Sequence, residues 1–161
     1  WNLISKPKNL DYKADLYFEK NKQFSIVEIK NVVCASYDPK KDIYGQKTRF
    51  HDYKTPFIRA GVYPYGELNQ SYRGQKVVSE RSIRQIEFMK KHKDKYKFFI
   101  LFLVNRGDCE IFKPCWKIDP TYAKALISAQ RCGITIHAIK INWTLSGCYF
   151  DKELKIDLEE W

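Results

Sequence analysis

Two acidic residues and one lysine stand where they could hold a metal ion beside a phosphate group. Glu28 and Lys30 are two residues apart near the end of an apolar run, and Asp15 lies in the run before it. Carboxylate oxygens are the ligands that Mg²⁺ or Mn²⁺ takes from proteins, with waters and a substrate phosphate completing the shell. The ion would polarise a phosphodiester and lower the pKa of a bound water. Lys30 could orient that water or offset developing negative charge.

Two neighbouring strands would bring these side chains together. Runs rich in aromatic and β-branched residues predict one strand over residues 12–19 and a second over residues 23–33. The polar pair Asn21-Lys22 between them predicts a tight loop. In a hairpin with a two-residue loop, the register follows by counting outward from the residues that flank the loop.

This register places the two acids opposite each other. Asp15 is expected to pair with Glu28, and Lys13 with Lys30, and opposed residues share a face with Cβ atoms roughly 5 Å apart. Two carboxylates this close repel each other unless a cation lies between them. A divalent ion would satisfy them, and so would a cross-strand ion pair with the two lysines. The spacing leaves both interpretations open.

The charge of the chain favours a polyanionic partner such as DNA or RNA. Lys and Arg number 29 against 19 Asp and Glu, a net charge of +10 over 161 residues. In residues 36–76, eight basic residues alternate with eight aromatic residues and few positions are typical of a core. Cations neutralise phosphates and aromatic rings stack on exposed bases. Alternatively, this region is a surface excursion that covers the domain's own sheet or grips another protein. The predicted nucleic-acid contacts are Lys13, Arg49, Arg59, Arg73, Lys76, Arg81 and Arg84.

The rest of the chain predicts helices alternating with strands. Helical spacing and capping residues predict one helix over residues 79–92 and a second over residues 119–133. The apolar run 98–104 predicts a central strand covered on both faces, and residues 134–143 predict another strand. The order predicts an α/β fold, with a single domain over residues 1–161.

Composition narrows the class of protein further. Five cysteines at irregular spacings favour the reduced thiols of an intracellular protein over the disulfides of a secreted one. The longest apolar run has seven residues, against roughly 20 for a membrane-spanning helix. We therefore expect an intracellular, non-secreted protein with no membrane partner.

Several short motifs, in order, resemble those of a known family. The segments KADLYF, VEIKNV, VVSERSIRQIEFM, FFILFLVNRGDCEIFKPCWKIDPTYAKAL and GITIHAIKI are similar to the nuclease-like carboxy-terminal domain of the sugar fermentation stimulation protein family, SfsA. The matching residues are Lys13, Asp15, Glu28, Lys30, Asn31, Ser79, Glu80, Arg81, Phe112, Pro114, Ile118, Asp119, Pro120, Tyr122 and Ala123. The Asp and Glu-x-Lys pattern also resembles the core of PD-(D/E)XK nucleases.

The resemblance implies a restriction-endonuclease-like (PD-(D/E)XK) fold, with a mixed central sheet flanked by helices. It implies Asp15 and Glu28 as metal ligands, Lys30 as the catalytic lysine and Mg²⁺ or Mn²⁺ as the cofactor. The implied function is metal-dependent hydrolysis of phosphodiester bonds in DNA or RNA. The alternative is a nucleic-acid-binding or scaffold module of a larger protein or complex, with little or no cleavage activity.

The chain also departs from the family pattern. The family's amino-terminal OB-like domain has no counterpart in the sequence, and residues 36–76 form a long insertion outside the resemblance. Ser82 and Gln85 replace the glycine and histidine that follow the family's Thr-Glu-Arg motif. The two functional hypotheses make different predictions: a nuclease needs a divalent ion between Asp15 and Glu28, whereas in a binding module Lys13 and Lys30 would neutralise both acids.

Overall fold

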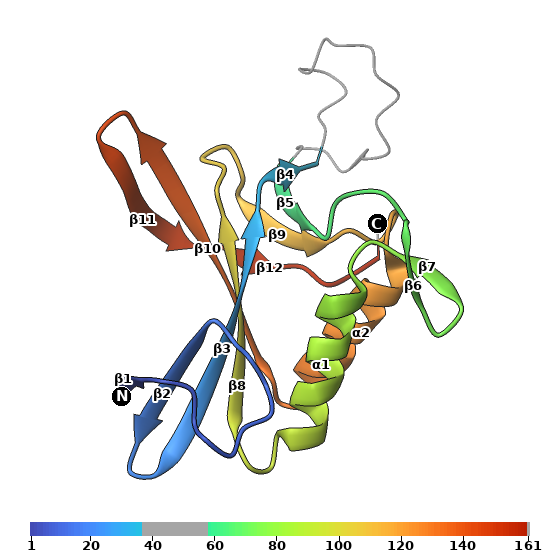
Figure 1. The fold of residues 1–161 in the computed structure, drawn as a ribbon. Coiled ribbons are helices and arrows are strands. Elements are labelled where there is room, and N and C mark those ends of the chain that lie inside the picture. Colours follow the sequence, from blue (N-terminus) through green and yellow to red (C-terminus); the bar gives the residue numbers. More distant parts are fainter. Residues whose placement is uncertain (37–57, 161) are drawn as a thin grey trace.

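A computed structural model of the protein describes residues 1–36 and 58–160. Within these ranges the chain forms three sheets and two helices, α1 (Glu80–His92) and α2 (Pro120–Arg131) (Figure 1). The strands are β1 (Asn2–Ile4), β2 (Leu16–Lys20), β3 (Gln23–Val32), β4 (Cys34–Ala35), β5 (Ala60–Tyr63), β6 (Gln70–Tyr72), β7 (Gln75–Val77), β8 (Lys97–Val104), β9 (Ile111–Pro114), β10 (Thr135–Thr144), β11 (Gly147–Glu153) and β12 (Lys155–Ile156). The predicted α/β class is confirmed. Neither of the described helices has the length and apolarity that crossing a bilayer requires.

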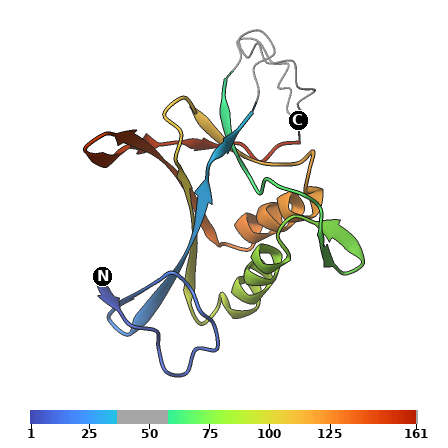
Figure 2. The same cartoon turned by 45° about the horizontal axis from the view of Figure 1, so that its top comes forward.

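The largest sheet is mixed and has the strand order β1-β2-β3-β8-β10-β11. Strands β3, β8 and β10 are parallel to one another. The pairs β1–β2, β2–β3 and β10–β11 are antiparallel. Parallel neighbours need a crossover, and α1 and α2 lie within the two crossovers. Both crossovers step in the same direction, so right-handed connections place both helices on one face of the sheet, as Figures 1 and 2 show.

Strand β8 runs through the middle of this sheet, as its apolar sequence predicts. Phe98, Ile100, Phe102 and Val104 are buried on the face that the helices cover, whereas the apolar residues between them are only half-buried. The prediction that this strand is covered on both faces is therefore wrong. Its alternate residues face the side of the sheet that carries neither helix.

Both helices begin at the residues that capping chemistry predicts. The Ser79 hydroxyl accepts a hydrogen bond from Ser82 N at 3.4 Å, and the Asp119 carboxylate accepts one from Tyr122 N at 2.9 Å. After α2 the chain turns at Gly133, whose φ of +88° lies in the left-handed region that glycine adopts readily. The local sequence thus determines where α1 and α2 start and where α2 stops.

Part of the predicted insertion belongs to the core. Residues 37–57 lie outside the described part of the chain, but β5 is almost wholly buried in a second sheet of order β12-β9-β5-β4. Gly61 permits its close packing, because a Cβ there would lie 2.8 Å from Cγ1 of Val104. The expectation of few core positions in residues 36–76 is therefore wrong for β5. Its sequence is only four residues long and stands between Arg59 and Pro64, which is too short for a clear strand signal.

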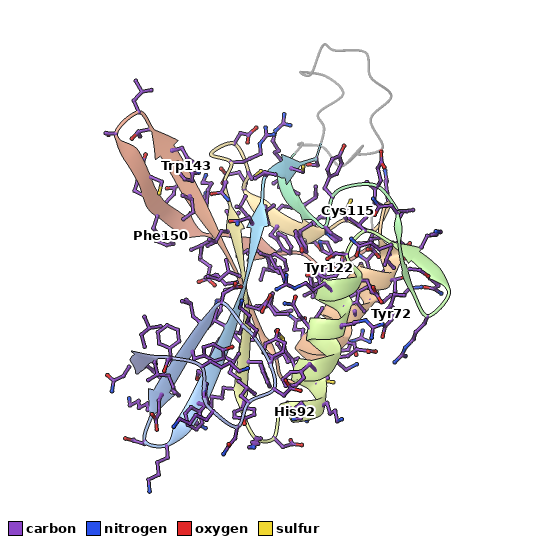
Figure 3. The ribbon with its side chains drawn as sticks, in the orientation of Figure 1. Tyr72, His92, Cys115, Tyr122, Trp143 and Phe150 are labelled. Atoms are coloured by element: carbon purple, nitrogen blue, oxygen red, sulfur yellow. The ribbon has the colours of Figure 1, made fainter. Side chains whose placement is uncertain are left out.

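Strands β10 and β11 form a hairpin that extends away from the helices (Figure 3). Trp143 and Phe150 on this hairpin are 64% and 60% exposed. At its base, the buried Lys140 lies 3.2 Å from the Glu110 carboxylate and 3.1 Å from that of Asp151. Lys140 therefore links the two strands of the hairpin to the segment that precedes β9.

Candidate functional site

The β2–β3 hairpin has the predicted register over a shorter length. Its ladder runs from the pair Lys20–Gln23 to the pair Leu16–Val27. The first strand, predicted from residue 12, begins only at Leu16. The expected pairs of Asp15 and of Lys13 therefore lie beyond the end of the ladder.

A tyrosine side chain shapes the segment that precedes β2. The Tyr17 hydroxyl accepts a hydrogen bond from Ala14 N at 2.6 Å and donates one to Tyr12 O at 2.8 Å. These bonds hold the segment in an irregular conformation that the strand prediction did not include. The predicted pairing of Lys13 with Lys30 is wrong, because Lys13 lies in this segment with an exposed side chain.

Asp15 is exposed and lies at the end of the ladder, next to Glu28. Its Oδ2 accepts a hydrogen bond from Ile29 N at 2.6 Å, so the carboxylate replaces the next backbone acceptor of β2. Within the described chain, Oδ1 of Asp15 receives no hydrogen bond. The backbone of β3 thus holds Asp15 beside Glu28, and one carboxylate oxygen stays available to a ligand.

Glu28 is the buried acid of the site, only 3% exposed. The Tyr12 hydroxyl donates to its Oε2 at 3.0 Å, Lys30 Nζ donates to its Oε1 at 2.9 Å, and Gln85 Nε2 also donates to Oε1. A buried carboxylate is costly unless it is paired and hydrogen-bonded, and these donors supply both. A carboxylate has about four acceptor positions, so one position on Oε2 remains open.

Lys30 closes a ring of polar contacts beneath α1. Its Nζ donates to Glu28 Oε1 and, at 2.6 Å, to Gln85 Oε1, and its side chain is 11% exposed. Glu28 and Lys30 share one face of β3 because they are two residues apart. Gln85 reaches them from the second turn of α1. Lys30 therefore pairs with Glu28, as the binding-module hypothesis predicts, whereas no lysine of the described residues pairs with Asp15.

Tyr12 is held in place by aromatic packing. Its ring stacks on Phe88 of α1, with ring centroids 4.5 Å apart and planes 11° apart. Burial, and then the nearby carboxylate of Glu28, raise the pKa of Tyr12 far above its usual range. The phenol stays protonated at neutral pH and acts as a permanent donor to Glu28.

Neither Tyr12 nor Gln85 was predicted as a site residue from the sequence. Gln85 was noted only as a departure from the family motif, although the sequence contains a signal that its side chain is buried and hydrogen-bonded. It lies four residues before Met89, on the buried side of an amphipathic helix, where an amide needs hydrogen-bond partners. The signal for Tyr12 is weaker, because its role depends on the turn before β2.

The seven predicted nucleic-acid contacts fall into separate groups. Arg49 lies outside the described residues, and Lys13 lies in the segment before β2. Arg59 donates to Ser36 O at 2.8 Å and lies 3.2 Å from the Asp108 carboxylate. Arg59 thus connects two loops of the fold, which is a structural role.

The remaining four basic residues lie on α1 and on the hairpin of β6 and β7. Glu80 N donates to Gln70 Oε1 at 2.9 Å, which joins β6 to the start of α1. We call these four residues the basic group of α1: Arg73, Lys76, Arg81 and Arg84.

Acidic neighbours partly neutralise the basic group of α1. Arg73 lies 2.9 Å from the Glu87 carboxylate, and Arg84 lies 2.7 Å from the Glu80 carboxylate. The other two members, Lys76 and Arg81, are exposed, and neither has an acidic partner among the residues that the structure describes. These two are therefore the members best able to meet a phosphate.

The donor set of the site suits one kind of metal ion. Across residues 1–36 and 58–160, no group of three or more His, Cys, Asp or Glu side chains could hold a metal. A set limited to the two carboxylates of Asp15 and Glu28 would fit a hard cation that keeps most of its waters. The same set does not fit a structural zinc ion, which takes four nitrogen or sulfur ligands.

Comparison with known proteins identifies relatives of part of the chain. Residues 76–147 match the family model described as "Sugar fermentation stimulation protein RE domain", a segment that includes Gln85 but not Asp15, Glu28 or Lys30. A sugar fermentation stimulation protein homolog of Carboxydothermus hydrogenoformans is 37% identical over 78 residues, 48% of this chain and 34% of that protein. The homolog of Pyrobaculum islandicum is 38% identical over 63 residues, 39% of this chain and 27% of that protein.

A solved structure extends the similarity to nearly the whole chain. The structure of Pyrococcus furiosus SfsA in complex with Ca²⁺ matches with a TM-score of 0.66 at 23% identity. The match covers 96% of this chain and 55% of that chain, so this chain spans about half the length of that protein. The fold is that of SfsA over this length, and the sequence matches support the relationship to the SfsA family that the motifs indicated.

Proposed function

We propose that this chain is an SfsA-like domain that binds nucleic acid and hydrolyses its phosphodiester bonds with the help of a divalent cation. The observation that carries this proposal is the arrangement of Asp15, Glu28 and Lys30. An exposed carboxylate is held beside a buried one, and an ammonium group contacts the buried one. The Ca²⁺ complex of Pyrococcus furiosus SfsA supports it, because Ca²⁺, like Mg²⁺, takes oxygen ligands.

Asp15 Oδ1 and Glu28 Oε2 are the oxygens that would hold Mg²⁺ or Mn²⁺. Each has an acceptor position that no described donor uses. When bound, the cation would polarise a phosphoryl oxygen and lower the pKa of a coordinated water. Tyr12 and Lys30 hold the Glu28 carboxylate in one orientation, because Tyr12 binds its Oε2 and Lys30 binds its Oε1.

Lys30 contributes positive charge where negative charge develops. Its ammonium is only slightly exposed and is held by two acceptors, so it is already oriented before substrate arrives. A charge that needs no reorganisation stabilises a transition state more than one in water does. Lys30 thus offsets the charge on the phosphate as the phosphodiester bond breaks.

The exposed cations at the start of α1 would bind the nucleic-acid backbone. Arg81 lies four residues before Gln85, so the two side chains lie on the same stripe of the helix, one turn apart. Gln85 contacts Glu28, so Arg81 lies one helical turn from a residue that binds the buried acid. Lys76 adds a second cation on the adjacent hairpin. Contacts of this kind position a backbone without reading its sequence.

A second candidate is a module that binds nucleic acid without cutting it. The contact of Lys30 with both Glu28 and Gln85 favours this candidate. The ammonium already neutralises the buried acid, so the fold does not require a cation there.

A cleavage assay combined with a binding titration tests the two candidates. Labelled single- and double-stranded DNA and RNA are incubated with Mg²⁺ or Mn²⁺, and binding is measured in chelator. Asp15→Asn and Lys30→Gln are compared with Lys91→Gln, which changes an exposed lysine near the other end of α1. Circular dichroism and thermal unfolding verify that each variant is folded.

The nuclease proposal predicts cleavage that needs the metal and falls by about 10²-fold or more in Asp15→Asn and Lys30→Gln, but not in Lys91→Gln. Salt-sensitive binding without metal-dependent cleavage by the wild type would support the second candidate. Absence of both binding and cleavage would contradict both.

A further inference from the structure

We infer that Gln85 is a positioning residue that fixes Glu28 and Lys30 relative to each other; this inference rests on the proposed function of the site. The two charged residues are two positions apart on β3, whereas Gln85 comes from α1, 57 residues after Glu28. Gln85 therefore connects α1 to the charged side chains on β3. Its amide contacts both charged groups at once.

The amide of Gln85 matches the acid and the base. Nε2 donates to Oε1 of Glu28, and Oε1 accepts a hydrogen bond from Lys30 Nζ at 2.6 Å. Lys30 Nζ also lies 2.9 Å from Oε1 of Glu28. The three side chains form a closed ring of three hydrogen bonds, so none of them can rotate without breaking two contacts.

Only one orientation of this amide is compatible with its neighbours. Turning it over would set its NH₂ group against the ammonium of Lys30 and its carbonyl against the carboxylate of Glu28. Both contacts would be repulsive, and Gln85 is only 6% exposed, so water could not relieve them. The amide is uncharged and links the acid to the base without adding charge to the site.

The backbone that carries Gln85 is firmly placed. Ile83, Ile86 and Met89 on either side of it are buried in the core. One turn before it, the Ser82 hydroxyl lies 2.9 Å from the hydroxyl of Tyr63, at the capped start of α1. A polar side chain on such an element loses little freedom when it binds, which makes it suited to hold other groups in position.

The ring also determines which oxygen of Glu28 can face a ligand. Gln85 and Lys30 both use Oε1, whereas Tyr12 uses one position of Oε2. Loss of the Gln85 amide would free a position on Oε1 and release the ammonium from one of its two acceptors. The acid and the base would then sample orientations that the wild type excludes.

The ¹⁵N–¹H signal of the Lys30 ammonium gives a test that needs no activity. An ammonium held by two acceptors exchanges its protons slowly enough to be observed, and loss of the signal in Lys30→Arg assigns it. The signal is expected to broaden or disappear in Gln85→Leu and in Gln85→Met, which differ in shape and so guard against misfolding of one variant. Gln130→Leu, on an exposed position of α2, is the matched control and should retain it. An unchanged Lys30 signal in folded Gln85→Leu and Gln85→Met would overturn the inference.

Kinetics give a second test that a purely structural role would not satisfy. Gln85→Leu is expected to lower kcat by about 10- to 100-fold, with KM and the affinity for nucleic acid in chelator nearly unchanged. Because Gln85 acts through Lys30, it should have little further effect in a Lys30→Gln background. Fully additive effects would contradict the inference. If the wild type does not cleave, the proposed function fails, and the ammonium signal alone decides the role of Gln85.

Discussion

The hydroxyl of Tyr12 donates a hydrogen bond to Oε2 of Glu28 over 3.0 Å, from a ring that stacks on Phe88 of α1. This contact connects the segment before β2 to the buried acid on β3. It also places the phenol of Tyr12, which keeps its proton, against the buried carboxylate of Glu28, which accepts the hydrogen bond. Two measurable consequences follow for stability.

Tyr12→Phe is expected to lower the free energy of unfolding by about 1–2 kcal/mol. The phenylalanine can keep the stack on Phe88, but the buried Oε2 of Glu28 loses its donor. Urea unfolding at pH 7 measures the difference. Tyr149→Phe, on the exposed strand β11, serves as the control and should change stability little. Equal stability of Tyr12→Phe and wild type would show that the hydrogen bond is not maintained in solution.

Alkaline pH should reduce the stabilising effect of Tyr12. Burial and Glu28 raise the pKa of Tyr12 in the folded state, so the unfolded chain loses this proton first as pH rises. The contribution is fully present below pH 10, and above it stability falls by about 1.4 kcal/mol per pH unit for one such group. Urea unfolding between pH 9 and 11 should therefore show a steeper decline for the wild type than for Tyr12→Phe. Parallel curves would contradict this assignment.

Two substitutions of Asp15 separate its backbone contact from its charge. Asp15→Asn retains an acceptor for Ile29 N and should unfold with nearly wild-type free energy, whereas Asp15→Ala should lose about 1 kcal/mol. Both variants should bind Mn²⁺ more weakly than the wild type in calorimetric titrations, because both lack the carboxylate. Undiminished Mn²⁺ binding by Asp15→Asn would remove Asp15 from the predicted ligands.

Asp119 should be more important for stability than an ordinary helix cap. Its buried carboxylate accepts hydrogen bonds from Tyr122 N at 2.9 Å and from Val78 N at 2.8 Å, so it also fixes the connection between β7 and α1. Asp119→Ala is expected to cost about 3 kcal/mol, against about 1 kcal/mol for Ser79→Ala at the cap of α1. Denaturant unfolding of both variants provides the comparison. Similar losses would mean that the contact with Val78 contributes little.

The salt dependence of nucleic-acid binding should distinguish the members of the basic group of α1. Lys76→Gln and Arg81→Gln are each expected to reduce the slope of log K against log salt by about 1. Arg84→Gln should reduce it less, because Glu80 already pairs with Arg84. Fluorescence anisotropy from low to moderate salt measures these slopes. Equal slopes for all variants would place the binding surface elsewhere.

The sequence by itself determined the features that depend on near neighbours in the chain. The loop at Asn21-Lys22 set the register of β2 and β3, and Ser79 and Asp119 set the starts of the helices. These features follow from backbone geometry and capping over a few residues. The central position of β8 followed from its unbroken apolar run.

Only the tertiary structure decided which polar groups meet. Tyr17 ended the β2 ladder early, and Gln85 reached Glu28 and Lys30 from a helix more than fifty residues away. Buried polar side chains must find partners wherever the packed elements bring them together, and sequence spacing does not record that distance. For the same reason, the hairpin pattern predicted that the two acids would be neighbours, but not the donors that hold the buried one in place.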